Sequence, residues 1–193
     1  MLPLAADELV LIRPAPSEAR GRLCGRRDVP ARFDDGAALR RIALALAGVR
    51  DVVTSPALRC RQTAAAVFPR HAPITDERFW EQDFGAEEGM AYADLPDLGR
   101  LARTALAARR ALGGESFADM VTRVIHALNA LAARAQSAVP IAVVAHAGTV
   151  RAGLALALDA MPAALAFEIA PLSVTRLRCL DGAFSVICVN CDS

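Results

Sequence analysis

The chain has few aromatic side chains, although its apolar share is high. Aromatic residues make up 5% of the 193 residues, whereas apolar residues make up 54%. Much of that apolar share is alanine, in runs such as LALALAG and GLALALDAM. Ala-rich helices pack closely against a sheet, so the composition favours a layered α/β protein over an all-β protein.

The chain also lacks an excess of charge and a long hydrophobic run. Its 22 basic and 21 acidic residues give a formal net charge of +1, whereas nucleic-acid binders normally carry a basic excess. No apolar stretch reaches the roughly 18 residues of a membrane span, and MLPLAADELV lacks the basic region and apolar core of a signal peptide. We therefore expect no nucleic-acid partner, no membrane association and a cytoplasmic location.

The cysteines number five: Cys24, Cys60, Cys179, Cys188 and Cys191. An odd count without a signal peptide indicates reduced thiols. The last two cysteines have CxxC spacing, but a closed zinc site needs two further ligands. Packing at a strand end is therefore the favoured interpretation of this pair, ahead of a metal site.

Strand-like and helix-like segments alternate along the chain. Segments 8–13, 51–55, 72–80 and 140–148 predict strands, and segments 35–48, 57–68, 98–112, 115–136 and 149–161 predict helices. The C-terminal segments 166–170, 173–180 and 183–190 predict further strands, the last two joined by a turn at Asp181-Gly182. This order predicts one domain over residues 1–193, a three-layer α/β/α sandwich with a mainly parallel central sheet.

Basic side chains follow three of the predicted strands. Arg13, the segment 55–59 with Arg59, and His146 each come directly after a strand. Ligands of open α/β sheets bind beyond the carboxyl ends of the strands. Two arginines and a histidine at one edge of the sheet indicate an anion site.

Five motifs in chain order carry a family resemblance. They are LVLIR (9–13), TSPALRCRQTA (54–64), ERFWEQDFGAEEG (77–89), GGESFADMVTRV (113–124) and IAVVAHAGTVR (141–151). Together they resemble the histidine phosphatase superfamily, also called phosphoglycerate mutase-like. The loop GRLCGRRDVP (21–30) is most similar to the branch that includes α-ribazole phosphatases.

The resemblance implies a phosphate pocket and a metal-free mechanism without a cofactor. In the family, a histidine attacks phosphorus, arginines hold the phosphoryl oxygens, and a carboxylic acid protonates the leaving oxygen. Carried over, Arg13 and Arg59 are the phosphate clamps, His146 is the second pocket histidine, and Glu81 is the general acid and base. The implied ligand is a small phosphorylated molecule or inorganic phosphate.

The choice of Glu81 depends on its spacing to Phe84-Gly85 and Glu88-Gly89, which fits the family pattern best. The competing carboxylates in the same segment are Glu77, Asp83, Glu87 and Glu88. Glu115 is interpreted as a first-turn helix residue that borders the pocket at most.

The nucleophile does not carry over, because Pro14 stands where the family has histidine. Proline has neither a nucleophilic side chain nor a backbone N–H that could donate to a phosphate. Either a deletion or a substitution of the histidine accounts for the proline at this position. Cys24 is not the favoured replacement, since its position matches a rim residue and not the line of attack.

Three functions follow from this departure. The first is a pseudoenzyme that binds phosphate or a phosphorylated metabolite. The second is an active phosphomonoesterase, similar to α-ribazole-phosphate phosphatase, that uses His146 or activated water. The third is a structural or partner-binding protein. The sequence leaves the ligand and the oligomeric state open.

Overall fold

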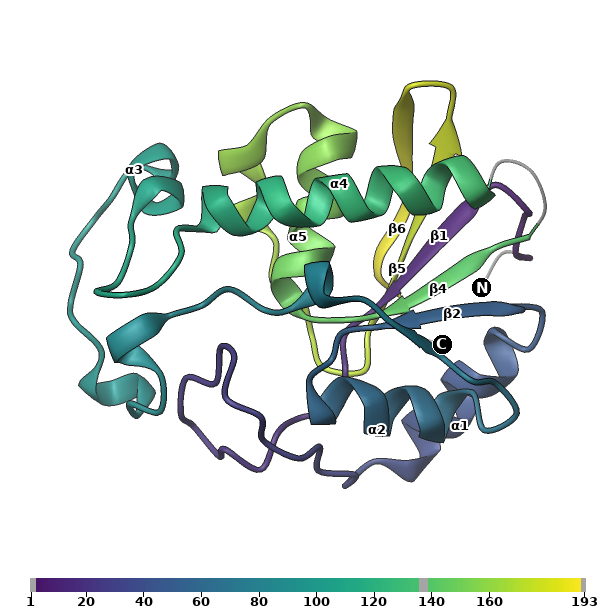
Figure 1. Cartoon of the computed structure of the whole chain (residues 1–193), viewed down its shortest axis with the longest axis horizontal. Helices are drawn as coiled ribbons and strands as arrows, with labels where there is room; N and C mark the ends of the chain where they lie inside the picture. The colour runs from purple at the N-terminus through teal and green to yellow at the C-terminus, as the bar shows by residue number, and fades with distance from the viewer. Residues whose placement is uncertain (1–2, 136–138, 192–193) are drawn as a thin grey trace.

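The computed structural model describes residues 3–135 and 139–191, which form a six-stranded sheet with helices on both faces (Figure 1). The strands are β1 (Glu8–Ile12), β2 (Asp51–Thr54), β3 (Ile74–Thr75), β4 (Ile141–Val144), β5 (Val174–Leu180) and β6 (Ala183–Cys191), in the order β3-β2-β4-β1-β5-β6. The first four strands run parallel, β5 runs antiparallel to β1, and β6 runs antiparallel to β5. The predicted α/β/α sandwich with a mainly parallel sheet is confirmed.

The helices divide between the two faces of the sheet. One face carries α1 (Gly36–Ala45) and α2 (Leu58–Val67), and the other carries α4 (Phe117–Ala135) and α5 (Ala147–Leu158) (Figure 1). The short α3 (Arg103–Ala108) lies at the periphery, and 3₁₀ turns η1 to η4 cover Glu77–Phe79, Gly85–Glu87, Tyr92–Asp94 and Met161–Ala166.

Successive side chains of the central strands enter opposite cores. Leu9 and Leu11 of β1 pack in the core beneath α4 and α5, whereas Val10 and Ile12 pack in the core beneath α1 and α2. All four side chains are fully buried. Burial on both faces explains why residues 9–12 of β1 and 141–144 of β4 read as unbroken apolar runs, as parallel strands do.

Helix α5 approaches the sheet closely at Gly153. A Cβ atom at this position would lie 2.8 Å from a methyl carbon of Leu11 and 2.8 Å from one of Leu177. Glycine therefore sets the distance between α5 and the strands, and with it the position of the α5 N-terminus at the edge of the sheet.

Three predicted elements differ in the structure. The strand predicted over 72–80 is only two residues long, because the Asp76 carboxylate accepts from the Arg78 amide and turns the chain into η1. The helix predicted over 98–112 is limited to α3, which buries only Ala107 and so gains little from packing. Segment 166–170 forms no strand.

The C-terminal cysteines also differ from the prediction of reduced thiols, because Cys188 and Cys191 form a disulfide at the end of β6. The other three cysteines are free. Within residues 3–135 and 139–191 there is no group of three or more metal-binding side chains. No helix in that part of the chain is long and apolar enough to cross a membrane.

Candidate active site

A cavity of about 170 Å³ opens beyond the carboxyl ends of β1, β2 and β4. Arg13, Arg59, Glu81 and His146 all line it, so the structure brings together the four residues that the sequence singled out. Its wall is completed by loop residues that follow β1, by residues 23–25 and by Phe84, Tyr92, Ala147 and Pro171.

Arg13 directly follows the carboxyl end of β1 and is held there by the loop that precedes β5. Its backbone amide donates to the Ser173 carbonyl at 3.1 Å, and its guanidinium donates to the carbonyl of Ile169. Burial lowers the pKa of Arg13, nearby Glu81 opposes that shift, and Arg151 and Arg59 add to it. Mutual repulsion of these cations is what a bound anion would relieve.

Arg59 lies in the first turn of α2 and is almost fully buried. Its guanidinium donates to the Gly25 carbonyl at 2.8 Å and to the Arg27 carbonyl at 3.1 Å. The third acceptor is Nδ1 of His146, at 3.1 Å. Arg59 thus fixes the loop around residue 25 and the histidine in one arrangement, and it also lines the cavity.

His146 is the N-terminal cap of α5 and is held as one neutral tautomer. Because arginine can only donate, Nδ1 accepts from Arg59, and the proton sits on Nε2, which lies 2.8 Å from Oγ of Ser55. Burial, followed by the charges of Arg59, Arg13 and Arg123, places the pKa of His146 well below its usual value. In this arrangement neither ring nitrogen has a free lone pair for attack on phosphorus.

The position after Arg13 is a wall rather than a reactive group. Pro14 is buried and lines the cavity, and the Ala15 amide donates to Oγ1 of Thr63 at 3.1 Å. His71 instead lies within hydrogen-bond distance of the Val49 carbonyl, and His126 is exposed on α4. All three histidines lie among the described residues, and of these only His146 lines this cavity.

The N-terminus of α5 adds backbone dipoles to the same wall. Ala147, the first residue of this 12-residue helix, lines the cavity next to His146. The first amides of a helix lack partners inside the helix and carry partial positive charge. With Arg13 and Arg59, they make the cavity electropositive and suited to a tetrahedral anion.

Glu81 supplies a carboxylate to this cationic cavity. Its Oε1 accepts from the Gln82 amide at 3.0 Å. The same oxygen packs against Gly148, where an added Cβ atom would lie 2.3 Å away. Glycine at the start of α5 therefore makes the room that the Glu81 carboxylate occupies.

The other carboxylates of this segment have different partners. Glu77 accepts from the Trp80 indole, Asp83 from the Gly85 amide, Glu87 from Arg109, and Glu88 from the amides of Arg26, Arg27 and Phe84. None of the four lines the cavity. Glu81 is thus the one carboxylate of residues 77–89 that faces the arginines.

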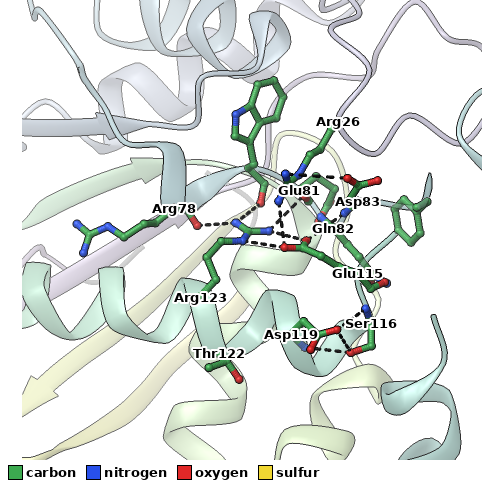
Figure 2. Close-up of polar contacts among 12 residues, drawn as sticks. Arg26, Arg78, Glu81, Gln82, Asp83, Glu115, Ser116, Asp119, Thr122 and Arg123 are labelled. Carbon is green, nitrogen blue, oxygen red and sulfur yellow. Dashed lines mark hydrogen bonds and ion pairs between the residues drawn. The ribbon is translucent and has the colours of Figure 1, made fainter. Parts of the chain in front are cut away.

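A polar clamp, Glu115 with Arg123, holds the segment that carries Glu81 (Figure 2). Arg123 on α4 donates to the carbonyls of Arg78 at 2.7 Å, Trp80 at 3.0 Å and Glu81 at 3.4 Å. Glu115 accepts from Arg123 at 2.9 Å and from the Asp83 amide at 3.2 Å. The sequence placed Glu115 in the first helical turn, but α4 begins at Phe117 and Glu115 lies before it.

Glu115 is ionised within this clamp. Burial acts to raise the pKa of Glu115, but the hydrogen bonds from Arg123 and from the Asp83 amide outweigh it and hold the pKa below its usual value. Arg26 adds a second cation, 3.0 Å from the carboxylate (Figure 2). Sequence reasoning missed the clamp because residues 78, 115 and 123 share no helix face or strand.

Two thiols lie at the site and differ in exposure. Cys60 is fully buried, with its sulfur 3.6 Å from Nε2 of His146, and burial raises the pKa of its thiol to about 12. Cys24 is half-buried, lines the cavity and lies 3.3 Å from Oγ of Ser17. Cys60 is therefore an unreactive neighbour of His146, whereas Cys24 is open to reagents that enter the cavity.

The model of the histidine phosphatase superfamily (branch 1) matches residues 9–192. The chain belongs to this superfamily. The match spans all five motifs and confirms the family resemblance of the sequence.

Two solved structures of the superfamily fold show the same architecture. A histidine-to-alanine mutant of phosphoserine phosphatase from Entamoeba histolytica, in complex with phosphoserine, matches with a TM-score of 0.82 at 19% identity and covers 96% of this chain and 98% of its own. The mycobacterial glucosyl-3-phosphoglycerate phosphatase complexed with VO3 matches with a TM-score of 0.81 at 24% identity, covering 95% and 98%.

A curated relative is longer than this chain. The bifunctional protein Rv2228c of Mycobacterium tuberculosis is 34% identical over 154 residues, which are 74% of this chain and 41% of that protein. The chain thus spans about two fifths of the length of the curated relative that it matches.

Proposed function

We propose that this histidine phosphatase superfamily chain is a pseudoenzyme that binds phosphate or a small phosphorylated metabolite without hydrolysing it. The observation that carries the proposal is a cavity with Arg13, Arg59 and the α5 N-terminus on one side, and Pro14 where the family places its nucleophile. The cations stabilise a bound anion, but Pro14 has no side chain that could take the phosphoryl group at the position after Arg13.

The arrangement of His146 supports binding rather than catalysis. Its Nδ1 accepts from Arg59 and its Nε2 faces Ser55, so the ring serves as a neutral partner within the wall. The complex of phosphoserine with a histidine-to-alanine mutant of the Entamoeba enzyme supports the same view. In that fold, a chain without one of its histidines still holds a phosphorylated ligand.

The second candidate is an active phosphomonoesterase of the α-ribazole-phosphate type. Glu81 favours it, because a carboxyl group beside two arginines is placed to protonate a leaving oxygen or to activate water. The loop 21–30 resembles that branch. This candidate requires either that His146 leaves its hydrogen-bond partners or that water attacks the phosphorus directly. For both candidates, a cytoplasmic location stays a prediction.

Calorimetry with inorganic phosphate tests the proposed function. We expect a Kd of about 1 mM or lower, equivalent to roughly −4 kcal/mol, and at least about tenfold weaker binding by Arg13→Gln. The matched control is Arg50→Gln, which removes an exposed arginine just before β2, at the opposite edge of the sheet. Equal affinity of all three proteins would contradict the site, and steady turnover of a phosphomonoester would favour the phosphatase.

A further inference from the structure

A second cavity, of about 210 Å³, adjoins the first cavity, which Arg13 and Arg59 line. Glu81 and Phe84 line both cavities. A group attached to a phosphate in the first cavity therefore has a path past the Glu81 carboxyl into the second. The volume lies below the roughly 300–1,000 Å³ of pockets that enclose drug-sized ligands, so a small metabolite fits it better than a large one.

The walls of the second cavity are part apolar and part charged, with the carboxylate of Glu81 beside two arginines. Leu106, Phe117 and Leu165 supply aliphatic and aromatic surface together with Phe84, and Arg109 and Arg151 supply charge. Leu106, Phe117, Arg151 and Leu165 come from α3, the start of α4, α5 and η4, whereas Phe84 and Arg109 lie outside these elements. A ligand that fills this space thus needs an apolar body and a group that complements a guanidinium.

The two arginines differ in how their charge is balanced. Arg109 donates to both carboxylate oxygens of Glu87, which neutralises it. Arg151 donates its Nε and Nη2 to one carbonyl, that of Phe167, both at 3.0 Å. Among residues 3–135 and 139–191, no carboxylate forms an ion pair with Arg151 and its Nη1 has no hydrogen-bond partner.

A half-buried arginine is stabilised when a carboxylate binds to it, since charge-assisted hydrogen bonds are stronger than hydrogen bonds between neutral groups. We propose that the second cavity binds the group attached to phosphate and that Arg151 pairs there with a carboxylate of the ligand. The selected class is a small phosphomonoester with an apolar body and a carboxylate. This inference rests on the proposed function, because phosphate must occupy the first cavity.

Two aryl phosphates of equal size test the pairing. The probes are 4-carboxyphenyl phosphate and 4-carbamoylphenyl phosphate, which share the ring and differ in one negative charge. By calorimetry at low salt, the unmodified chain should bind the carboxylate at least about tenfold more tightly than the amide. Arg151→Gln should bring the ratio close to one, whereas Arg50→Gln should retain it.

A second variant covers the case in which loss of the Phe167 contact prevents Arg151→Gln from folding. Leu106→Glu places a carboxylate in the second cavity from a side chain that is 39% exposed. It should reduce the preference for the carboxyphenyl probe at least about tenfold by occupying Arg151. An unchanged ratio in either folded variant would overturn the inference.

The outcomes also separate this inference from the proposed function. If inorganic phosphate binds and the two aryl phosphates bind equally, the second cavity does not select a carboxylate and the proposed function stands. If inorganic phosphate itself does not bind, the proposed function fails and this inference fails with it.

Discussion

Nη2 of Arg59 lies 3.1 Å from Nδ1 of His146, inside a wall that buries both side chains. The arginine can only donate, so the histidine must accept and stay neutral. The same arginine holds the carbonyls of Gly25 and Arg27. The shape of the cavity that Arg13 and Arg59 line and the protonation state of its histidine are therefore set by one side chain.

The neutral state of His146 predicts a pH dependence of stability. The folded-state pKa lies below the unfolded value of about 6.5, so the unfolded chain binds the proton first and stability falls as pH drops below about 6.5. The slope from this group is up to roughly 1.4 kcal/mol per pH unit. Urea unfolding at pH 7.5 and 5.5 should show this slope reduced in His146→Gln.

The control for the pH experiment is His126→Gln, because His126 is exposed on α4. It should keep the slope of the unmodified chain. Equal slopes in the unmodified chain and His146→Gln would show that the histidine is not held neutral.

Substitutions of Arg13 and Arg59 should weaken phosphate binding alike but lower the free energy of unfolding by different amounts. Arg13 donates to a single carbonyl, that of Ile169, so Arg13→Gln should lower the free energy of unfolding by no more than about 1 kcal/mol. Arg59 has three acceptors, so Arg59→Gln should lower it by about 2–4 kcal/mol. Both variants should bind phosphate at least about tenfold more weakly. Denaturation curves and calorimetry measure the two effects, and equal stability losses would contradict the hydrogen-bond assignment.

Cys24 should report occupation of the cavity. Among the described residues it is the half-buried free thiol, and it lines the same cavity as Arg13 and Arg59, whereas Cys60 and Cys179 are buried. N-ethylmaleimide should therefore modify Cys24 first in the native protein, as peptide mass spectrometry can establish. Saturating phosphate should slow this reaction several-fold, while sodium chloride of the same ionic strength should not. A rate that phosphate leaves unchanged would place the anion elsewhere.

The clamp of Glu115 with Arg123 should stabilise the segment that carries Glu81. Arg123→Gln removes the charge-assisted bonds to Glu115 and should lower the free energy of unfolding by about 2 kcal/mol. Trp80 is the single tryptophan, and its carbonyl accepts from Arg123. The fluorescence emission of Trp80 should therefore shift to longer wavelength in Arg123→Gln. Arg134→Gln, at an exposed ion pair with Asp51, should cost less than about 0.5 kcal/mol. Equal effects of the two variants would contradict the clamp.

The sequence predicts the framework of this fold well, because its signals are local. Unbroken apolar runs mark β1 and β4, and Asp35 caps α1 by accepting from the Ala38 amide at 2.8 Å. Arg13 and His146 follow strands directly, so the topology of a parallel sheet is enough to bring them to one edge.

The parts that the sequence does not predict depend on distant partners. Glu8 of β1 and Arg176 of β5 form a buried ion pair, with the closest atoms 2.7 Å apart, although they lie far apart in the chain. Segment 166–170 looks strand-like, but the Ile169 carbonyl accepts from Arg13 and the Ala170 amide donates to the side chain of Asn190. These backbone groups pair with side chains, and the Phe167 amide and Ala170 carbonyl pair with nearby backbone groups, so none of them pairs with the backbone of a neighbouring strand.

Release of p-nitrophenol from p-nitrophenyl phosphate tests the central claim most directly. If the proposed function holds, the chain as it stands should show no turnover above that of Arg59→Ala, because Pro14 offers no nucleophile at the position after Arg13; loss of a nucleophile costs about 10⁶ in rate in other enzymes. Inserting a histidine between Arg13 and Pro14 should restore activity, and more of it than Pro14→His, since the insertion leaves Pro14 and Pro16 in place. The restored enzyme should form an acid-labile phosphohistidine. Turnover by the unmodified chain that His146→Ala abolishes would contradict the account and establish an active phosphatase.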